Sequence, residues 1–344
     1  MKKIDFAIGG QAVIEGVMMR SPNTIVISVR KNTGEILVKD KFYRTLTQRI
    51  KVLNIPLVRG VINLFEMMVI GTQAINFSAN EFVEQPAEPE PAEPAKSAGA
   101  KPAESTATTK LAEPAPEPKP KSVLAKAGEI AMFAFSLVLA IALSIFLFKF
   151  LPLWITTAIE KTSITIQKNW IVFNLIDGIL KTSFFVLYIF LLSLIPSFQR
   201  IFEYHGAEHK AVFTYEKALP LTTKNARRQS RFHPRCGTSF ILIVFVISIL
   251  IYTFVPKQPD FWTNLGLRLA FLPLIAGIAY EYLKISARYA HHKWTKLLVA
   301  PGLWLQRLTT KEPSNDQLEV ALNSLRIALE KESTLATSPP PLPH

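Results

Sequence analysis

Four long apolar runs lie between residues 130 and 283, and they form the strongest pattern in the sequence. The runs 130–148 and 238–255 carry no charged side chain, whereas 171–198 and 265–283 carry two each. Each run is close to the roughly 20 residues that an α-helix needs to cross the hydrocarbon core of a bilayer. We therefore predict an α-helical multi-pass membrane bundle of about four spans, contained in a transmembrane domain of residues 127–310.

The N-terminal region has the sequence pattern of β-strands and turns instead of long apolar runs. Residues 24–29 are rich in β-branched side chains, residues 31–34 have turn chemistry, and residues 36–38 resume the strand pattern. Glycines punctuate the apolar stretch before them, which indicates sharp turns or a close approach of the backbone. We predict a small β-rich unit over residues 1–59 on the cytoplasmic side.

An apolar helix of residues 61–77 follows this unit and is interrupted by Glu66. It is long enough to span a bilayer, but the chain before it is strongly basic, which favours keeping that end inside. We therefore interpret the segment 60–82 as a helix that lies on the inner membrane face or dips into it.

Three further segments differ from the membrane pattern. Residues 83–126 are rich in Pro, Ala, Glu and Lys, a composition that predicts a disordered linker without chemistry of its own. Residues 311–332 place leucines at helical spacing opposite a polar face, which predicts a soluble amphipathic helix that could dock an unknown protein partner. Residues 333–344 form a Pro-rich tail that is expected to be disordered.

The distribution of charge supports this topology. The net charge is +13, and the basic residues flank the apolar runs instead of alternating with stacking aromatic residues, so nucleic acid is not expected as a partner. The loop 200–236 and the chain after residue 283 are basic, whereas the other two loops are nearly neutral, so both termini are predicted to be cytoplasmic.

The single cysteine excludes an intramolecular disulfide framework. Four arginines of the basic loop are candidates for contact with anionic lipid headgroups: Arg227, Arg228, Arg231 and Arg235.

The candidate chemistry is concentrated in that same loop. His205 and His209 are four residues apart, so on a helix both imidazoles project from one face, and Glu208 lies on that face as well. This is the His-x-x-Glu-His pattern of inverted zinc peptidases, in which two imidazoles bind the metal and the carboxylate handles a proton. The alternative is a histidine pair at the membrane interface with no metal.

A second cluster precedes the third span. His233 and Cys236 are both suitable zinc ligands, and the intervening loop can bring them near the first pair. If both bind together with the two histidines, the ion is enclosed and structural. If only three residues bind, one position stays open and Glu208 becomes a base. Alternatively, Cys236 is a buried residue at a helix start, and the arginines around it bind lipid phosphates.

Charged residues inside the predicted spans are functional candidates by default. Glu281 lies late in the fourth span and could supply a carboxylate ligand; the simpler alternatives are pairing with Arg268 or snorkelling to the inner surface. Asp177 and Lys181 are one helical turn apart, so we expect a mutual ion pair.

Several strings in the chain are long enough to carry a family resemblance. The stretches 9–20, 204–210, 233–240 and 301–306 closely resemble the YqhQ-like family of bacterial membrane proteins, a family of unknown function whose members are labelled predicted metal-dependent enzymes. The resemblance implies a bacterial cytoplasmic membrane location and a metal site at the positions His205, Glu208, His209, His233 and Cys236.

These observations favour a membrane protein with a divalent metal site, zinc-like, at the cytoplasmic face. The leading hypothesis is a metal-dependent hydrolase that acts on a membrane peptide or a lipid-linked group, with Glu208 as general base. The alternative is a scaffold without enzymatic activity, in which any metal is structural. A transporter is a third hypothesis because of the charges inside the spans, but no inverted repeat is evident.

Overall fold

The computed structural model describes residues 8–83, 123–288 and 293–337. The chain divides into two compact units, one formed by Met1–Gln85 with Phe146–His344 and the other by Pro86–Ile145. In the second unit the described residues form α3 (Val123–Ile145), a helix of 23 residues. The predicted linker and tail fall largely outside the described residues.

The N-terminal residues form a four-stranded antiparallel sheet in the order β1-β2-β3-β4, which confirms the predicted β-rich unit. The strands are β1 (Gly9–Val13), β2 (Gly16–Arg20), β3 (Thr24–Arg30) and β4 (Ile36–Phe42). Strand β2 is almost fully buried because helices cover both faces of the sheet. Its alternate side chains therefore enter different cores: Val17 and Met19 enter one, and Met18 enters the other.

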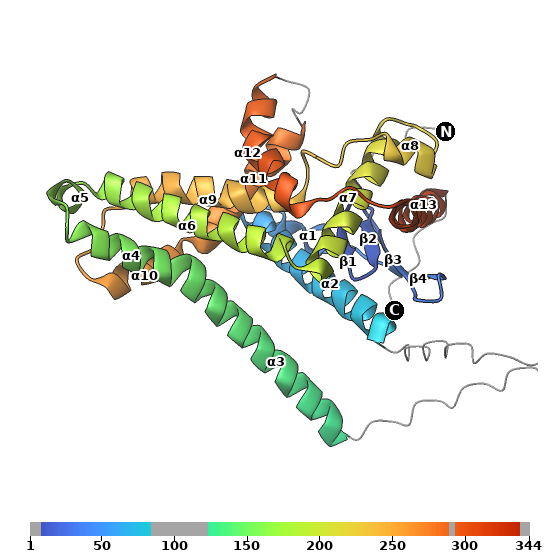
Figure 1. Ribbon diagram of the computed structural model, residues 1–344, viewed down its shortest axis with the longest axis horizontal. Coiled ribbons are helices and arrows are strands. Elements are labelled where there is room, and N and C mark those ends of the chain that lie inside the picture. Colours follow the sequence, from blue (N-terminus) through green and yellow to red (C-terminus); the bar gives the residue numbers. More distant parts are fainter. Residues whose placement is uncertain (1–7, 84–122, 289–292, 338–344) are drawn as a thin grey trace, which may run out of the picture. The chain divides into compact units, whose positions relative to one another are not determined.

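The helix α13 (Asn315–Thr337) covers the first face, where it lies across β2 and β3 (Figure 1). Its Leu318, Leu322 and Leu325 are buried against Val17 and Met19. The apolar stripe predicted from the leucine spacing thus packs against the sheet of the same chain. Docking of a protein partner on this helix stays a prediction.

The helix α2 (Val58–Val83) covers the second face, where Ile70 and Ala74 pack against Met18. Two short helices precede it, α1 (Leu46–Arg49) and the 3-10 turn η1 (Lys51–Leu53). The sheet is therefore held between an early helix and the last helix of the chain.

The remaining helical elements lie between α3 and α13 in the chain, and those of them that are mostly apolar form a bundle. In chain order, the remaining elements are the π-helical η2 (Phe146–Phe150), α4 (Leu151–Glu160), α5 (Ile164–Lys168), α6 (Trp170–Ser193), α7 (Pro196–Glu216), α8 (Thr223–Arg227), α9 (Gly237–Thr253), α10 (Phe261–Ala270), α11 (Leu272–Arg288) and α12 (Lys293–Thr309). Figure 1 shows α6 and α9 running side by side, and α9 also packs against α11 and α12. The helix α9 is apolar on all sides, although Ile241, Val246 and Leu250 are exposed.

Four helices in the described part of the chain are long and apolar enough to cross a membrane: Val58–Phe82, Ala134–Glu160, Trp170–Ser193 and Phe261–Ser286. Three of them correspond to predicted spans. The first is the helix that we expected to lie on the membrane surface. The predicted third span is α9, which has only 17 residues.

The second predicted span ends earlier than residue 198, because α6 stops at Ser193 and Pro196 begins the next helix. A proline disfavours helical geometry in the residue before it, and Ile195 is extended, with φ −82° and ψ 125°. The resulting break lets α7 change direction toward the sheet, which α7 contacts through β1 and β2.

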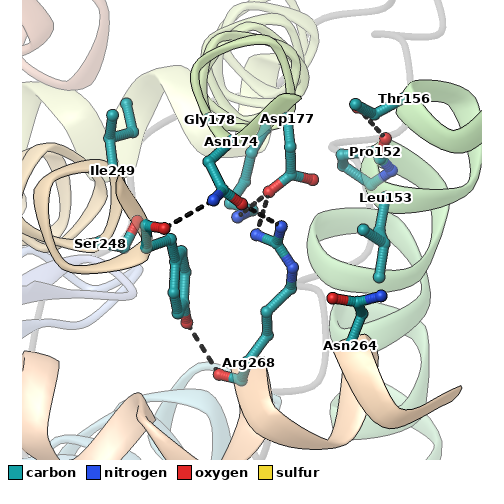
Figure 2. A network of polar contacts seen from close by, with 12 residues as sticks. Pro152, Leu153, Thr156, Asn174, Asp177, Gly178, Ser248, Ile249, Asn264 and Arg268 are labelled. Carbon is teal, nitrogen blue, oxygen red and sulfur yellow. Dashed lines mark hydrogen bonds and ion pairs between the residues drawn. The ribbon is translucent and has the colours of Figure 1, made fainter. Parts of the chain in front are cut away.

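A buried polar network joins α6, α9 and α10 inside the bundle (Figure 2). Asp177 accepts hydrogen bonds from Arg268 and from Lys181, whose Nζ lies 3.0 Å from Asp177 Oδ2. Asn174 accepts from Arg268 at 2.6 Å, and Tyr252 donates to the Arg268 carbonyl at 2.8 Å. The predicted Asp177–Lys181 ion pair is present, and Arg268 belongs to it.

Candidate metal centre

The helix α7 positions three of the predicted site residues, because His205, Glu208 and His209 occupy little more than one of its turns. The two imidazole rings are in contact in an edge-on arrangement, with centroids 4.4 Å apart. Arg200 at the start of the helix forms an ion pair with Glu15, in the turn between β1 and β2, and Tyr204 donates to the same carboxylate at 3.2 Å. These contacts fix α7 against the edge of the sheet.

Backbone carbonyls determine the tautomer of both histidines. His205 Nδ1 lies 2.8 Å from the Thr309 carbonyl oxygen, and His209 Nδ1 lies 2.5 Å from that of Arg231. A carbonyl oxygen can only accept, so each Nδ1 carries the proton and each Nε2 presents a lone pair. Metal-binding histidines are usually oriented by this kind of second hydrogen bond.

The two Nε2 atoms differ in their surroundings. His205 Nε2 lies 3.1 Å from the sulfur of Cys236, whereas the buried His209 Nε2 has no hydrogen-bond partner. Burial also lowers the pKa of His209, so its ring is neutral, which is the form that binds a metal. A buried nitrogen lone pair without a donor costs free energy unless something binds to it.

Cys236 completes the group from another element. It is the N-cap of α9, and its sulfur accepts from the Thr238 backbone N–H at 3.4 Å. Metals bind cysteine as its thiolate. Ligand atoms of His205, His209 and Cys236 all lie within 4.8 Å of one another. A tetrahedral zinc site places such atoms about 3.3 to 3.6 Å apart, so closure takes shifts on the order of 1 Å.

Gly206 allows the chain segment that orients His205 to approach the helix. A Cβ atom at this position would lie 2.1 Å from the Lys311 carbonyl oxygen. The Lys311 N–H in turn donates to the Phe202 carbonyl at 2.8 Å, which fixes the segment beside α7. The glycine that weakens the helical propensity of the motif therefore has a packing role.

Glu208 is buried beside the three-residue group but does not belong to it. The Gly10 N–H donates to its carboxylate, and a Cβ atom at Gly10 would lie 3.0 Å from Glu208 Cγ. Burial raises the pKa of Glu208, and the neighbouring His205 counteracts part of that effect. The side chain lines a cavity of about 900 Å³ that His205, His209 and Cys236 also line.

His233 lies close to this group, but both of its ring nitrogens are occupied. Nδ1 accepts from the Arg235 N–H at 3.2 Å, and Nε2 lies 3.2 Å from the Glu216 carboxylate, to which it donates. Burial lowers the pKa of His233 to about 4, so the ring is neutral at pH 7. Its centroid is 5.6 Å from that of His209.

The structure places Glu281 away from the histidines. Its carboxylate is bound by Arg59, with Arg59 Nε 2.6 Å from Oε1. Glu281 therefore pairs with Arg59 and not with Arg268. Of the five predicted ligands, the structure brings three together, keeps His233 beside them with other partners, and puts Glu281 in a separate ion pair.

The arginines of the basic loop mostly bind groups of the protein itself. Arg227 donates to Asn315, Arg231 to the Thr310 carbonyl, and Arg235 pairs with Glu216. Arg228 is exposed. Contact of these side chains with lipid headgroups stays a prediction.

The cavity has walls of two kinds. Besides the histidines and Cys236, it is lined by apolar residues from helices that are long and apolar enough to cross a membrane: Leu64, Met67, Ile189, Leu192 and Leu283. A ligand of this cavity would therefore contact the polar group at one wall and the apolar helices at another.

The part of the chain that carries these residues also matches known proteins. A family model described as "Protein of unknown function (DUF1385)" matches residues 55–331, which include all the candidate ligands. The chain belongs to this family. It is also 33% identical over 335 residues to "Uncharacterized protein YqhQ" of Bacillus subtilis (strain 168), covering 96% of this chain and 95% of that protein. The resemblance identified from the motifs is confirmed. No solved structure matches the chain.

Some contacts of this family member's site cannot be found from motifs. The carbonyls of Thr309 and Arg231 orient the imidazoles, yet backbone groups carry no sequence signal. The Glu216 partner of His233 lies 17 residues before it, at the end of α7. Counting the acids near the loop could have drawn attention to Glu216.

Proposed function

We propose that this protein is a multi-pass protein of the bacterial cytoplasmic membrane that binds one zinc-like divalent ion through His205, His209 and Cys236. The observation that supports the proposal best is the buried His209 Nε2, a lone pair without a partner beside a thiol and a second imidazole. The donor set of two nitrogens and one sulfur suits zinc.

The membrane placement rests on the three long apolar helices that correspond to predicted spans, on α9 as the other span with α2 at the inner membrane face, and on the asymmetry of loop charge. In this topology both termini are cytoplasmic, so the sheet and α7 lie on the inner side. Reporter fusions at the two ends test the assignment. A periplasmic signal from either end would contradict it.

We further propose a hydrolase, because three protein ligands leave one coordination position open. A zinc ion in such a site acts as a Lewis acid toward water or a carbonyl group. Glu208 would take up the proton, and its raised pKa brings the carboxyl closer to the range where a base works well at neutral pH. The apolar wall of the cavity supports a membrane peptide or a lipid-linked group as substrate.

A structural metal is the second candidate function. The three residues tie α7 to the start of α9, and Thr309 connects His205 to the end of α12. An ion at this junction would hold these segments together without any reaction, as in a membrane scaffold.

Metal analysis of detergent-purified protein tests the shared part of both candidates. We expect about one zinc per chain in the wild type, loss of zinc in His209→Ala, and full retention in Glu281→Gln, whose side chain binds Arg59. Absence of metal from the wild type after purification in zinc-containing buffer would refute the site.

Glu208→Gln separates the two candidates. A hydrolase requires the variant to keep its zinc and to lose turnover of lipid-linked and peptide substrates. Cobalt substitution gives a second measurement, since an open position permits an exchangeable water and a closed four-ligand site does not. Zinc retained with no open position would favour the scaffold.

A further inference from the structure

Residues 41–58, here called the interfacial segment, expose an unusual number of aliphatic side chains. They connect β4 to α2 and include α1 and η1. Val52 is 74% exposed, Ile55 53%, Ile50 47% and Leu46 44%. Large aliphatic side chains gathered on one short surface segment are unusual in water and mark a contact site.

The charges of the interfacial segment are of one sign. It contains four cations and no aspartate or glutamate. Among the described residues, none of these four side chains has an ion-pair partner: Lys41, Arg44, Arg49 and Lys51. The loop arginines 227, 231 and 235, by contrast, bind groups of the protein itself.

Polar groups of the interfacial segment form hydrogen bonds within the segment and with α2. The exposure of its aliphatic side chains therefore does not result from an unstructured chain. Thr45 and Gln48 form a reciprocal capping box at the start of α1. The Leu46 N–H and the Tyr43 hydroxyl both donate to Glu66 of α2, at 2.7 and 2.8 Å. Thr47 donates to Asn63 of the same helix at 3.0 Å. The inward groups face α2, and the aliphatic groups remain outside.

We propose that the interfacial segment inserts its aliphatic side chains into the cytoplasmic leaflet and that its cations bind anionic lipid headgroups. Aliphatic residues mixed with Lys and Arg are the composition of interfacial anchors, and the absence of acids suits a negatively charged surface. Its position supports the bilayer as the occupant: the segment leads directly into α2, one of the four helices long enough to cross a membrane. The surface of the membrane then lies where these side chains point.

Spin labelling of the full-length protein in lipid nanodiscs tests this proposal. Cys236 is buried, so native labelling reaches an introduced cysteine, and the unsubstituted protein gives the background. Val52→Cys is the probe. Thr33→Cys, in the exposed turn between β3 and β4, is the matched control.

In phosphatidylglycerol nanodiscs we expect the label at position 52 to be several-fold more accessible to oxygen than to a water-soluble nickel chelate, with the opposite order at position 33. Equal nickel accessibility at the two positions would overturn the insertion. Replacing the lipid by phosphatidylcholine should make position 52 shallower, and so should Arg49→Gln with Lys51→Gln in phosphatidylglycerol. Unchanged depth in both experiments would overturn the role of the headgroups.

Discussion

The two buried polar groups of this protein, the network around Asp177 and the group around His209, differ in how their atoms are paired. In the network, one carboxylate oxygen of Asp177 accepts from both Arg268 and Lys181 (Figure 2). Asn174 accepts from the Arg268 guanidinium, and Tyr252 donates to the Arg268 carbonyl. Although Asp177 Oδ1 has no hydrogen-bond partner, the other oxygen of this carboxylate binds two cations.

The group around His209 lacks a partner for one particular atom, His209 Nε2. Its imidazoles are oriented from behind by carbonyls, and the atoms on the opposite side are two lone pairs and a sulfur. A network whose charged groups bind one another joins helices, whereas an oriented lone pair without a partner, that of His209 Nε2, favours binding of an external cation. Substitutions in the two places should therefore separate stability from metal content.

The largest effect on stability is expected for Asp177→Ala. The substitution leaves Arg268 and Lys181 as buried cations without their carboxylate, and removal of one member of a buried ion pair typically costs about 3 to 5 kcal/mol. Thermal and denaturant unfolding in detergent measure the loss. Zinc bound by the molecules that remain folded should be unchanged.

Lys331→Gln is the matched control, because Lys331 forms an exposed ion pair with Asp40. Exposed pairs contribute at most about 1 kcal/mol. Equal destabilisation by both substitutions would mean that the buried network has no special role in holding the bundle.

Zinc itself should have the next effect. A ligand present at a hundredfold excess over its dissociation constant stabilises the folded state by about 2.7 kcal/mol. We expect that increase in the unfolding free energy of the wild type and none in His209→Ala or Cys236→Ser. Stabilisation of all three proteins by the same amount would show that zinc binds elsewhere.

Gly206→Ala should have a smaller effect on stability but should also weaken metal binding. The new Cβ meets the Lys311 carbonyl, and overpacking of this kind costs about 1 to 3 kcal/mol. Displacement of that segment also moves the Thr309 carbonyl that orients His205, so zinc affinity should fall.

Gly266→Ala provides the control for this substitution, since a Cβ there has no atom within 4 Å. Replacing a helical glycine in open space should be neutral or slightly stabilising. If both alanine variants behave alike, the close approach at Gly206 is not important.

The smallest effect is expected for Glu281→Gln. The substitution removes the negative charge that binds Arg59 but leaves an amide oxygen that can still accept a hydrogen bond from it, and it should leave the zinc content unchanged. Calorimetric zinc titration of the variant beside the wild type measures this. Lost binding would restore Glu281 as a ligand.

Much of the fold follows from local patterns. Long uncharged runs predict helices that can cross a membrane, and β-branched runs with turn residues predict strands 24–29 and 36–38. The end of α6 follows from Pro196, although the predicted span passed through it. What could not be predicted was the association of distant elements, such as α13 with β2 and β3, because apolar periodicity shows a face but not what covers it.

The sequence also identified part of the residue group around His209. The spacing of His205 and His209 and the soft sulfur of Cys236 identified residues that the structure places together. The prediction could not separate His233 from the group, since its exclusion depends on Glu216 and on the Arg235 N–H. Glu281 drew attention because charges at membrane depth are rare, but its Arg59 partner is more than 200 residues away.

The sheet also has a consequence for biosynthesis. One of its faces is covered by α13, where Ser324 donates to the Val26 carbonyl and Glu332 accepts from Ser21. These contacts join the region of β2 and β3 to a helix that is translated about 300 residues later. During translation these strands must wait with part of one apolar face uncovered, so a chain truncated before residue 315 leaves that part of the sheet exposed.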